Sequence, residues 1–261
     1  CDLGTDSYPS VAPGGTVYVG WENFNTVDLN QILVVSSADG GRTWSDPARV
    51  DLVQDLNFPQ NSDGRNTLTG CAFRVSVAAN TATDPTDATG NTVYSVFADN
   101  RNGSVTTDTA GNKVYATNTD VFLGRSTDGG RTWKVVTVDA SANDQFYPWV
   151  SVARDGRVDV GYMDRSYSAG QEECKYGFSV TRLTFDATGD VASLAKTRVD
   201  TGLSNPGNSR WFGLNSRFIG DYNALAIDAN GATWSLWTDQ RAPVSPATTR
   251  TGQHAVGGVT P

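Results

Sequence analysis

The sequence of 261 residues predicts an all-β fold, and three observations support this prediction. An octet of the form S-x-D-G-G-R-T-W occurs twice, at 37–44 and 126–133, so the chain contains an internal repeat. Apolar and polar residues alternate with a period of two between Asp-Gly and Asn-Gly turns, which is typical of strands joined by hairpins. No segment shows a convincing helical period. Units of roughly 50–90 residues with four strands each are typical of the blades of a β-propeller.

Each octet is expected to join two strands of one unit. The first octet lies between strands expected at 32–35 and 48–53, and the second between strands expected at 121–123 and 135–138. Asp-Gly-Gly allows a tight turn with positive φ, and the Asp carboxylate can accept backbone N–H groups across that turn. The octet is therefore interpreted as a well-formed hairpin turn in preference to a catalytic motif.

The other strands follow from a common pattern, in which a strand of small residues, a Gly turn and an alternating strand succeed one another. The first two strands of the four units are expected at 8–12 and 16–23, 71–78 and 92–101, 147–153 and 157–165, and 221–226 and 232–241. The second unit also carries an inserted polar turn from Asn80 to Asn91. The third unit continues with strands at 176–185 and 196–200, joined by 186–190 instead of an octet. The four predicted blades span 1–53, 54–139, 140–201 and 202–261 and form a single domain.

The octet resembles the Asp-box, S-x-D-x-G-x-T-W, of sialidase-like β-propellers with BNR repeats. In that family the Asp-box lies between the third and fourth strands of a blade, on the face away from the active site. The resemblance therefore implies the fold, and it makes Asp39 and Asp128 poor catalytic candidates. Because such propellers usually have six blades, it also implies that this chain is part of a larger propeller. The alternatives are a further blade within 54–70 or 202–217, or another chain that completes the ring.

The same resemblance directs attention to the opposite rim, where second strands end and first strands begin. Guanidinium groups there would hold a carboxylate by bidentate hydrogen bonds, carboxyl groups would act as acid or base, and Trp would stack on a sugar. The catalytic candidates are Asp99, Asp164, Asp221, Tyr222 and Asp239. The substrate-binding candidates are Arg74, Arg101, Arg165, Arg241 and Trp211. The alternative interpretation is that each Asp–Arg strand end is a local pair that holds the following loop.

A tyrosine nucleophile is a feature of sialidases, and the resemblance suggests Tyr222 or Tyr147 with Glu22 for this role. The F/Y-R-I-P motif of sialidases finds only a partial match. The nearest string, 73–76 (F-R-V-S), agrees in its first two positions and lies after the first octet instead of before it. The sequence thus departs from the family pattern where an enzyme would need it.

Composition limits the partners and cofactors. The net charge is −8, with a pI near 4.6, which argues against nucleic acid and anionic membranes as partners. No apolar run approaches the length of a membrane span. A chain that begins at Cys1 within a strand pattern is expected to be a mature or trimmed form, and the acidic, Lys-poor composition is compatible with a secreted bacterial protein.

The three cysteines, Cys1, Cys71 and Cys174, allow at most one internal disulfide, and the sequence leaves their pairing open. With a single histidine, His254, a zinc site is not expected. No cofactor is predicted. The one cation left open is Ca²⁺, for which the loops offer Asp84, Asp87, Asp99, Asn100 and Asn102, although solvated acidic loops are the simpler interpretation.

The sequence predicts two alternative functions. The first is a secreted glycoside hydrolase of exo-sialidase type that acts on terminal sugars of glycans. The second is a non-catalytic propeller that binds a glycan or a protein with the same rim.

Overall fold

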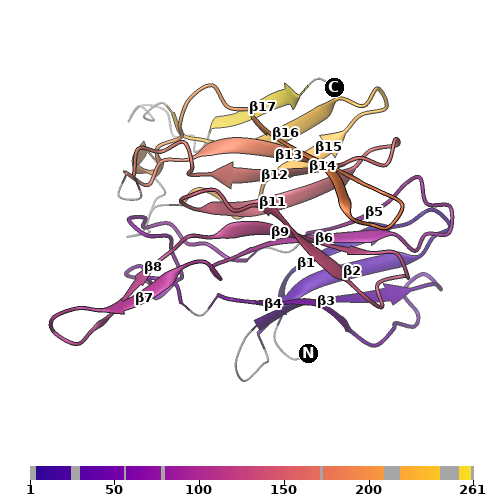
Figure 1. Cartoon of the computed structure of the whole chain (residues 1–261), viewed down its shortest axis with the longest axis horizontal. Coiled ribbons are helices and arrows are strands. Elements are labelled where there is room, and N and C mark those ends of the chain that lie inside the picture. The colour runs from indigo at the N-terminus through magenta and orange to yellow at the C-terminus, as the bar shows by residue number, and fades with distance from the viewer. Residues whose placement is uncertain are drawn as a thin grey trace.

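The computed structural model describes residues 4–24, 30–55, 57–77, 80–170, 173–208 and 218–241, together with the backbone of 253–259. Four antiparallel sheets follow one another along the chain (Figure 1). The first sheet contains β1 (Gly4–Val11), β2 (Val17–Asn23), β3 (Asn30–Ser37) and β4 (Ala48–Val53). The second contains β5 (Asn80–Thr83), β6 (Val93–Asp99), β9 (Asp120–Ser126) and β10 (Lys134–Asp139). The third contains β11 (Gln145–Val152), β12 (Val158–Asp164), β13 (Gly177–Phe185) and β14 (Val191–Arg198). The fourth contains β15 (Ala224–Ile227), β16 (Thr233–Asp239) and β17 (Gln253–Val259).

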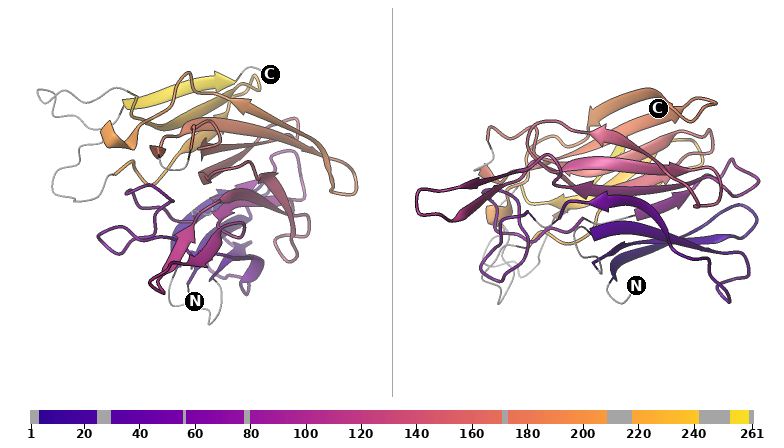
Figure 2. Two further views of the ribbon diagram at one scale, coloured as in Figure 1. Left: turned by 60° about the vertical axis from the view of Figure 1, so that its left-hand side comes forward. Right: turned by 60° about the horizontal axis from the view of Figure 1, so that its bottom comes forward.

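Each sheet is a simple meander in which the first strand is innermost. The first strands contact one another in chain order, β1 with β5, β5 with β11 and β11 with β15, as the stacked sheets of Figures 1 and 2 show. The first strand of the first sheet also reaches across to the later sheets. The ring of Tyr8 lies 5.1 Å from that of Trp149 and 6.3 Å from that of Tyr222. The four sheets are therefore arranged radially around one axis, and the all-β propeller prediction is confirmed.

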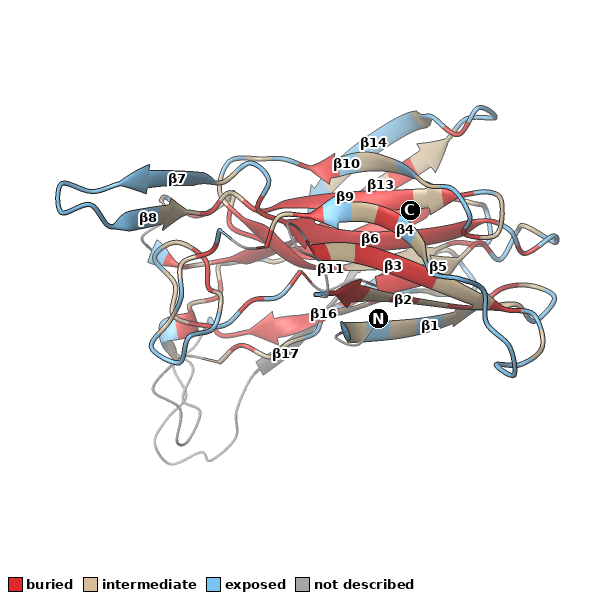
Figure 3. Cartoon of the chain, turned by 90° about the horizontal axis from the view of Figure 1, so that it is seen from below, coloured by how far each residue is buried: buried red, intermediate tan, exposed pale blue. Residues whose placement is uncertain are grey.

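The core lies between consecutive sheets. One apolar cluster joins the first sheet to the second, another joins the second to the third, and the last joins the third to the fourth. In the last cluster, Phe178 stacks on Trp237 at 4.8 Å. Burial of each such side chain stabilises the fold by about 1.5–3 kcal/mol. Buried residues accordingly fill the middle strands in Figure 3. In contrast, β14 and the strands at 104–107 and 113–116 are largely exposed.

The close approach of neighbouring sheets explains two glycines. Gly20 and Gly161 occupy the same register position, the fourth residue of β2 and of β12. A Cβ at Gly20 would collide with the Thr81 side chain of the next sheet, and one at Gly161 would press on Leu225 and Phe178. Glycine at this position lets the innermost strand of the following sheet pack directly on the backbone.

Both octets form the turns that their sequence predicts. Asp39 accepts hydrogen bonds from the backbone N–H groups of Arg42 and Thr43, each at 2.9 Å, and from the Thr43 hydroxyl at 2.6 Å. The hydroxyl and backbone N–H of Thr43 hold the pKa of Asp39 down to about 2. The second octet repeats these bonds around Asp128, at 3.0, 3.0 and 2.7 Å. Both carboxylates are thus fully used in closing their turns.

Two predictions about the second sheet were wrong. Its first strand is β5, at Asn80–Thr83, whereas residues 71–77 form a loop held by a disulfide at Cys71. The turn that was expected to begin at Asn80 is therefore strand at its start. The chain between β6 and β9 also forms an unpredicted hairpin, β7 (Ser104–Thr107) and β8 (Lys113–Ala116), which projects from the body in Figures 1 and 3.

The described part of the chain contains no α-helix. It includes a short 3-10 helix, η2 (Pro206–Asn208). None of its helical structure is long and apolar enough to cross a membrane. Within 54–70, a proposed place for a further blade, the described residues form a loop with one bridge between Gln60 and Asn66. Most of the other proposed segment, 202–217, lies outside the described residues.

Candidate functional site

A cavity of about 470 Å³ opens where the innermost strands begin, on the axis of the sheets. Charged and hydroxyl groups make up much of its wall. Four of its residues carry carboxyl groups, two carry guanidinium groups and two carry phenol groups: Asp6, Glu22, Asp55, Asp221, Arg65, Arg74, Tyr147 and Tyr222. Because β2 ends at this cavity and β3 runs back from it, the octet that follows β3 lies at the opposite edge.

Matching irregularities in β1 and β11 turn side chains toward this cavity. The register of β1 with β2 shifts between Thr5 and Tyr8, and that of β11 with β12 shifts between Phe146 and Trp149. Within these bulges Asp6 has φ +54° and Tyr147 has φ +50°, a left-handed conformation that non-glycine residues rarely adopt. Such strain clusters at functional sites, where the surrounding structure maintains it.

The fourth sheet presents a residue at the same place. The fourth residues of β2 and β12, Gly20 and Gly161, pair with Tyr8 and Trp149. Asp6 and Tyr147 each lie two residues before these partners. In the fourth sheet Ala224 is the partner of Leu236, so Tyr222 is the equivalent residue. All three side chains line the cavity. The register therefore delivers one axial side chain from each of these three sheets.

Glu22 and Asp55 form a carboxyl pair in the cavity wall. Glu22, in β2, is 1% exposed, and Asp55, just after β4, is 8% exposed. Burial, the charge of Asp55 and a hydrogen bond to Asp55 raise the pKa of Glu22 to about 9. Burial also raises the pKa of Asp55, although hydrogen bonds from Asn30 and Glu22 oppose the effect. With a pKa of about 9, Glu22 is protonated at neutral pH, and the charge of Asp55 favours this form.

Asp6 lies in the same electrostatic environment. Burial raises its pKa, a hydrogen bond with the Ser76 side chain lowers it, and the nearby charge of Asp221 raises it again. Asp221 in turn forms a bidentate pair with Arg74, with Nε–Oδ1 at 2.9 Å and Nη2–Oδ2 at 2.6 Å. The backbone carbonyl of Arg74 accepts the Tyr147 hydroxyl at 2.7 Å. The cavity wall thus combines the protonated carboxyl group of Glu22, the carboxyl group of Asp6 and an arginine, Arg74, whose charge is paired with Asp221.

Comparisons with known proteins support the fold. The sequence matches no family model, and no curated protein matches it. Among solved structures, it is similar to an α-L-arabinanase of Penicillium chrysogenum complexed with arabinobiose, with 14% identity and a TM-score of 0.52 over 97% of this chain and 61% of that one. A Hadza microbial sialidase has 15% identity and a TM-score of 0.51, over 98% and 44%. A sialidase of Streptococcus pneumoniae has 10% identity and a TM-score of 0.50, over 98% and 50%.

The fold is a β-propeller. The four sheets are its blades, and the cavity lies at their common axis. This chain spans 44 to 61% of the length of these neighbours.

The blade geometry separates the candidates predicted from sequence into two groups. Arg74, Asp221 and Tyr222 line the axial cavity, as do Tyr147 and Glu22, which were suggested as a nucleophile couple. Trp211 lies outside the described residues. The other candidates end the second strands of the blades and are absent from the described lining: Asp99, Arg101, Asp164, Arg165, Asp239 and Arg241.

The strand-end residues are held in local ion pairs. Arg101 donates to Asp99 at 2.7 Å and to Asp51 of the preceding blade at 3.0 Å, and its guanidinium lies 3.9 Å from the centre of the Phe122 ring. Arg241 donates through Nε to Asp239 at 2.6 Å. In each case Asp also accepts the backbone N–H of the arginine, at 3.1 Å. This arrangement corresponds to the structural interpretation, in which each pair fixes the loop after a second strand.

In the third blade, Asp164 and Arg165 have different partners from those at the other strand ends. Asp164 accepts Ser179 Oγ at 2.7 Å and Lys196 Nζ at 2.7 Å. Arg165 is completely buried and pairs with Asp144, which is also completely buried. A buried pair of this kind contributes to a fixed loop geometry and is strongly destabilising to break.

The described part of the chain contains no group of three His, Cys, Asp or Glu residues able to hold an ion. The loop carboxylates proposed for Ca²⁺ have protein partners. Asp84 accepts Thr86 N and Oγ1, and Asp87 accepts the backbone N–H groups of Thr89 and Thr92.

The charged cavity residues missed from the sequence are Asp6, Asp55 and Arg65. Asp6 precedes the apolar alternation of β1, so it resembles a flanking loop residue. Asp6 is equivalent to Tyr147 in register, but this equivalence depends on the bulges in β1 and β11, which the sequence does not reveal. Asp55 and Arg65 belong to the long segment between blades one and two, which carries no periodic signal.

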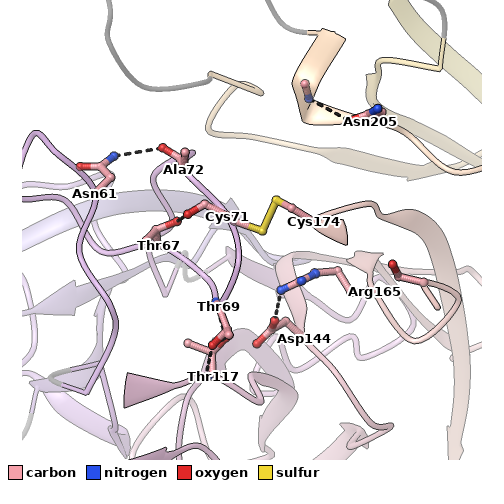
Figure 4. The surroundings of a disulfide bond; sticks show 12 residues. Asn61, Thr67, Thr69, Cys71, Ala72, Thr117, Asp144, Arg165, Cys174 and Asn205 are labelled. Atoms are coloured by element: carbon pink, nitrogen blue, oxygen red, sulfur yellow. Dashed lines mark hydrogen bonds and ion pairs between the residues drawn. A yellow bond between two sulfur atoms is a disulfide. The ribbon is translucent and has the colours of Figure 1, made fainter. Parts of the chain in front are cut away.

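A disulfide fixes this segment beside the cavity. Cys71 pairs with Cys174, with their Cα atoms 5.2 Å apart (Figure 4). Nearby, Thr69 and Thr117 exchange hydrogen bonds from backbone N–H to side-chain Oγ1, at 2.9 and 2.7 Å. The loop that carries Arg74 is thus tied both to the base of the hairpin and to the third blade.

We expect the double variant Cys71→Ser/Cys174→Ser to lose stability. The bond closes a span of 103 residues, and a loop of that length corresponds to about 2–5 kcal/mol of stabilisation. Urea denaturation would measure this difference, and wild-type protein unfolded with a thiol reductant is the control, since it should show the same loss. Equal denaturation midpoints for the variant and the oxidised wild type would contradict the prediction.

Proposed function

We propose that this protein is a glycoside hydrolase whose reacting groups lie in the axial cavity. The observation that carries the proposal is the Glu22–Asp55 pair, which keeps a proton at neutral pH in the wall of a cavity large enough for a sugar. Most glycoside hydrolases use a protonated carboxylic acid on one side of the scissile bond and a second carboxyl group on the other, and we assign these roles to Glu22 and Asp6.

The cavity residues divide the chemistry as follows. Glu22 gives its proton to the glycosidic oxygen as the bond from that oxygen to the anomeric carbon breaks. Asp6 faces the developing positive charge, and either attacks the anomeric carbon or takes a proton from the attacking water. Asp55 keeps Glu22 protonated before reaction and oriented by their shared hydrogen bond. Tyr147 and Tyr222 supply the remaining axial wall.

A narrower form of the proposal is an exo-sialidase acting on terminal sialic acid, with Tyr147 or Tyr222 as nucleophile. The solved sialidases of the same fold support it by analogy alone. An extracellular location belongs to the same proposal. The disulfide between Cys71 and Cys174 supports it, because such bonds persist in oxidising compartments.

The second candidate is a propeller that binds glycans without cleaving them. The observation in its favour is that Arg74 and Asp221 already satisfy each other across the cavity. Cavity and polar wall are common to both candidates, so only turnover distinguishes them.

A panel of fluorogenic glycosides tests the proposal. It should contain aryl glycosides of glucose, galactose, xylose and arabinose, the corresponding glucuronide and galacturonide, and an aryl sialoside. We expect turnover of at least one of them, measured as released fluorophore. Absence of turnover on the whole panel, together with binding of the same protein to a glycan array, would replace the hydrolase by the binding module.

A further inference from the structure

The wall of the axial cavity also carries information on the charge of its ligand. We propose that the cavity binds an uncharged sugar and discriminates against sugars that carry a carboxylate. This inference rests on the proposed function, which it narrows, and it runs against the sialidase form of that function.

The first argument concerns Arg74, which is one of the two guanidinium groups in the cavity wall; the other, Arg65, is exposed. Two of its N–H groups already hold Asp221, an ion pair between the second and fourth blades. Its guanidinium also lies 5.3 Å from the centre of the Phe218 ring. A substrate carboxylate that bound Arg74 would displace Asp221 and leave that carboxylate unpaired among other carboxyl groups.

The second argument concerns the balance of charge. With Glu22 protonated, three carboxyl groups, Asp6, Asp55 and Asp221, still face the two guanidinium groups of Arg65 and Arg74. Burial, and after it the nearby charge of Asp221, raises the pKa of Asp6, so negative charge is already disfavoured at this part of the wall. A further anion would add like-charge repulsion at short range.

The third argument concerns hydrogen bonding. Ionised carboxyl groups only accept hydrogen bonds, and they bind O–H donors through short, strong contacts. A neutral sugar offers several hydroxyl donors, whereas a sugar carboxylate offers more acceptors. The aromatic rings at the mouth, Tyr222 at 61% exposure and Phe24 at 39%, present apolar faces on which a neutral pyranose or furanose ring can pack.

Matched pairs of substrates test the inference directly. Aryl glucoside and aryl glucuronide differ only in the group on C5, as do the galactoside and galacturonide. We expect wild-type protein to prefer the neutral member of the pair in kcat/KM. We expect Asp221→Asn, which frees Arg74 and removes one negative charge, to shift the ratio at least about tenfold toward the carboxylated member. Asp46→Asn, the same change at an exposed turn outside the cavity, should leave the ratio unchanged.

Binding measured separately keeps this inference distinct from the proposed hydrolase. Calorimetric titration of methyl glycosides, methyl uronides and methyl sialoside into Glu22→Gln protein measures preference without turnover. Tighter binding of the neutral sugars with no turnover by wild type would overturn the hydrolase and support this inference. Preference for the uronides or the sialoside, by turnover or by binding, would overturn the inference and keep the hydrolase where turnover is seen. Failure to bind or cleave any of these sugars would overturn both.

Discussion

Replacement of Glu22 by glutamine is expected to lower kcat by about 10²–10⁴-fold on glycosides with alkyl leaving groups, because the variant cannot donate a proton. The loss should be much smaller on a dinitrophenyl glycoside, whose leaving group departs without protonation. Steady-state kinetics on the two substrates measure this difference. Glu173→Gln is the matched control, since Glu173 lies in an exposed loop and pairs only with Lys175 among its described contacts. Equal losses on both substrates would exclude Glu22 as the proton donor.

The same substitution should increase stability, and the increase should depend on pH. Glu22 has an ordinary pKa of 4.5 and a folded pKa of about 9, so between these values the folded protein binds a proton that the unfolded chain does not. Its contribution is fully present below the lower value and is lost as the pH rises toward the higher one. The slope for one proton is about 1.4 kcal/mol per pH unit. Urea titrations from pH 5 to 8 should show Glu22→Gln gaining on wild type by about this amount per unit, and parallel stability curves would contradict the proton assignment.

Replacement of Asp6 by asparagine is expected to lower kcat by at least about 10²-fold, because the reaction loses the carboxylate that faces the anomeric carbon. Folding should be preserved, since asparagine tolerates the left-handed conformation that Asp6 adopts at φ +54°. Thermal unfolding and kinetics on the best substrate of the panel measure the two effects. Asp46→Asn provides the control for a change of one charge.

Two further variants separate chemistry from strain. Asp6→Gly keeps the backbone conformation and removes the carboxyl group, and added azide or formate should restore part of its turnover if Asp6 attacks the anomeric carbon directly. Asp6→Ala places a Cβ in the left-handed region without the local hydrogen bonding of Asp, which costs about 1–2 kcal/mol. Full activity of Asp6→Gly without any added anion would show that Asp6 takes no part in the reaction.

Much of the fold could be predicted from the sequence, because the contacts that form its turns lie between residues close together in the chain. The octets identified two outer hairpins, since Ser, Asp, Gly, Thr and Trp each make their contacts within eight residues. The alternating second strands were equally legible, and β6, β12 and β16 end at the Asp residues where the pattern placed them. At the ends of β6 and β16 the Asp–Arg contacts also span only two residues, which explains why the sequence could offer the structural interpretation alongside the catalytic one.

The site could be predicted only in part, because non-local register creates it. Arg74, Tyr147 and Asp221 were identified as rim candidates, but their contacts with one another cross between blades. Asp6 enters the cavity through a bulge, a mismatch of two residues against one that no periodicity reveals. Asp55 becomes a partner of Glu22 only when the chain that leaves β4 approaches the end of β2, two strands away in the sheet. The pairing of Cys71 with Cys174, which the sequence left open, was likewise a matter of distance across the fold.

The shared register of Asp6, Tyr147 and Tyr222 has a consequence for how such a protein can change over evolutionary time. The three positions differ in how freely they can be exchanged. Asp6 and Tyr147 adopt the left-handed conformation within β1 and β11, and Tyr147 also belongs to the apolar cluster between the third and fourth blades. Tyr222, just before β15, is 61% exposed. An exchange at Tyr222 would therefore change what meets the ligand with the least effect on folding, and new specificity is expected to arise there first.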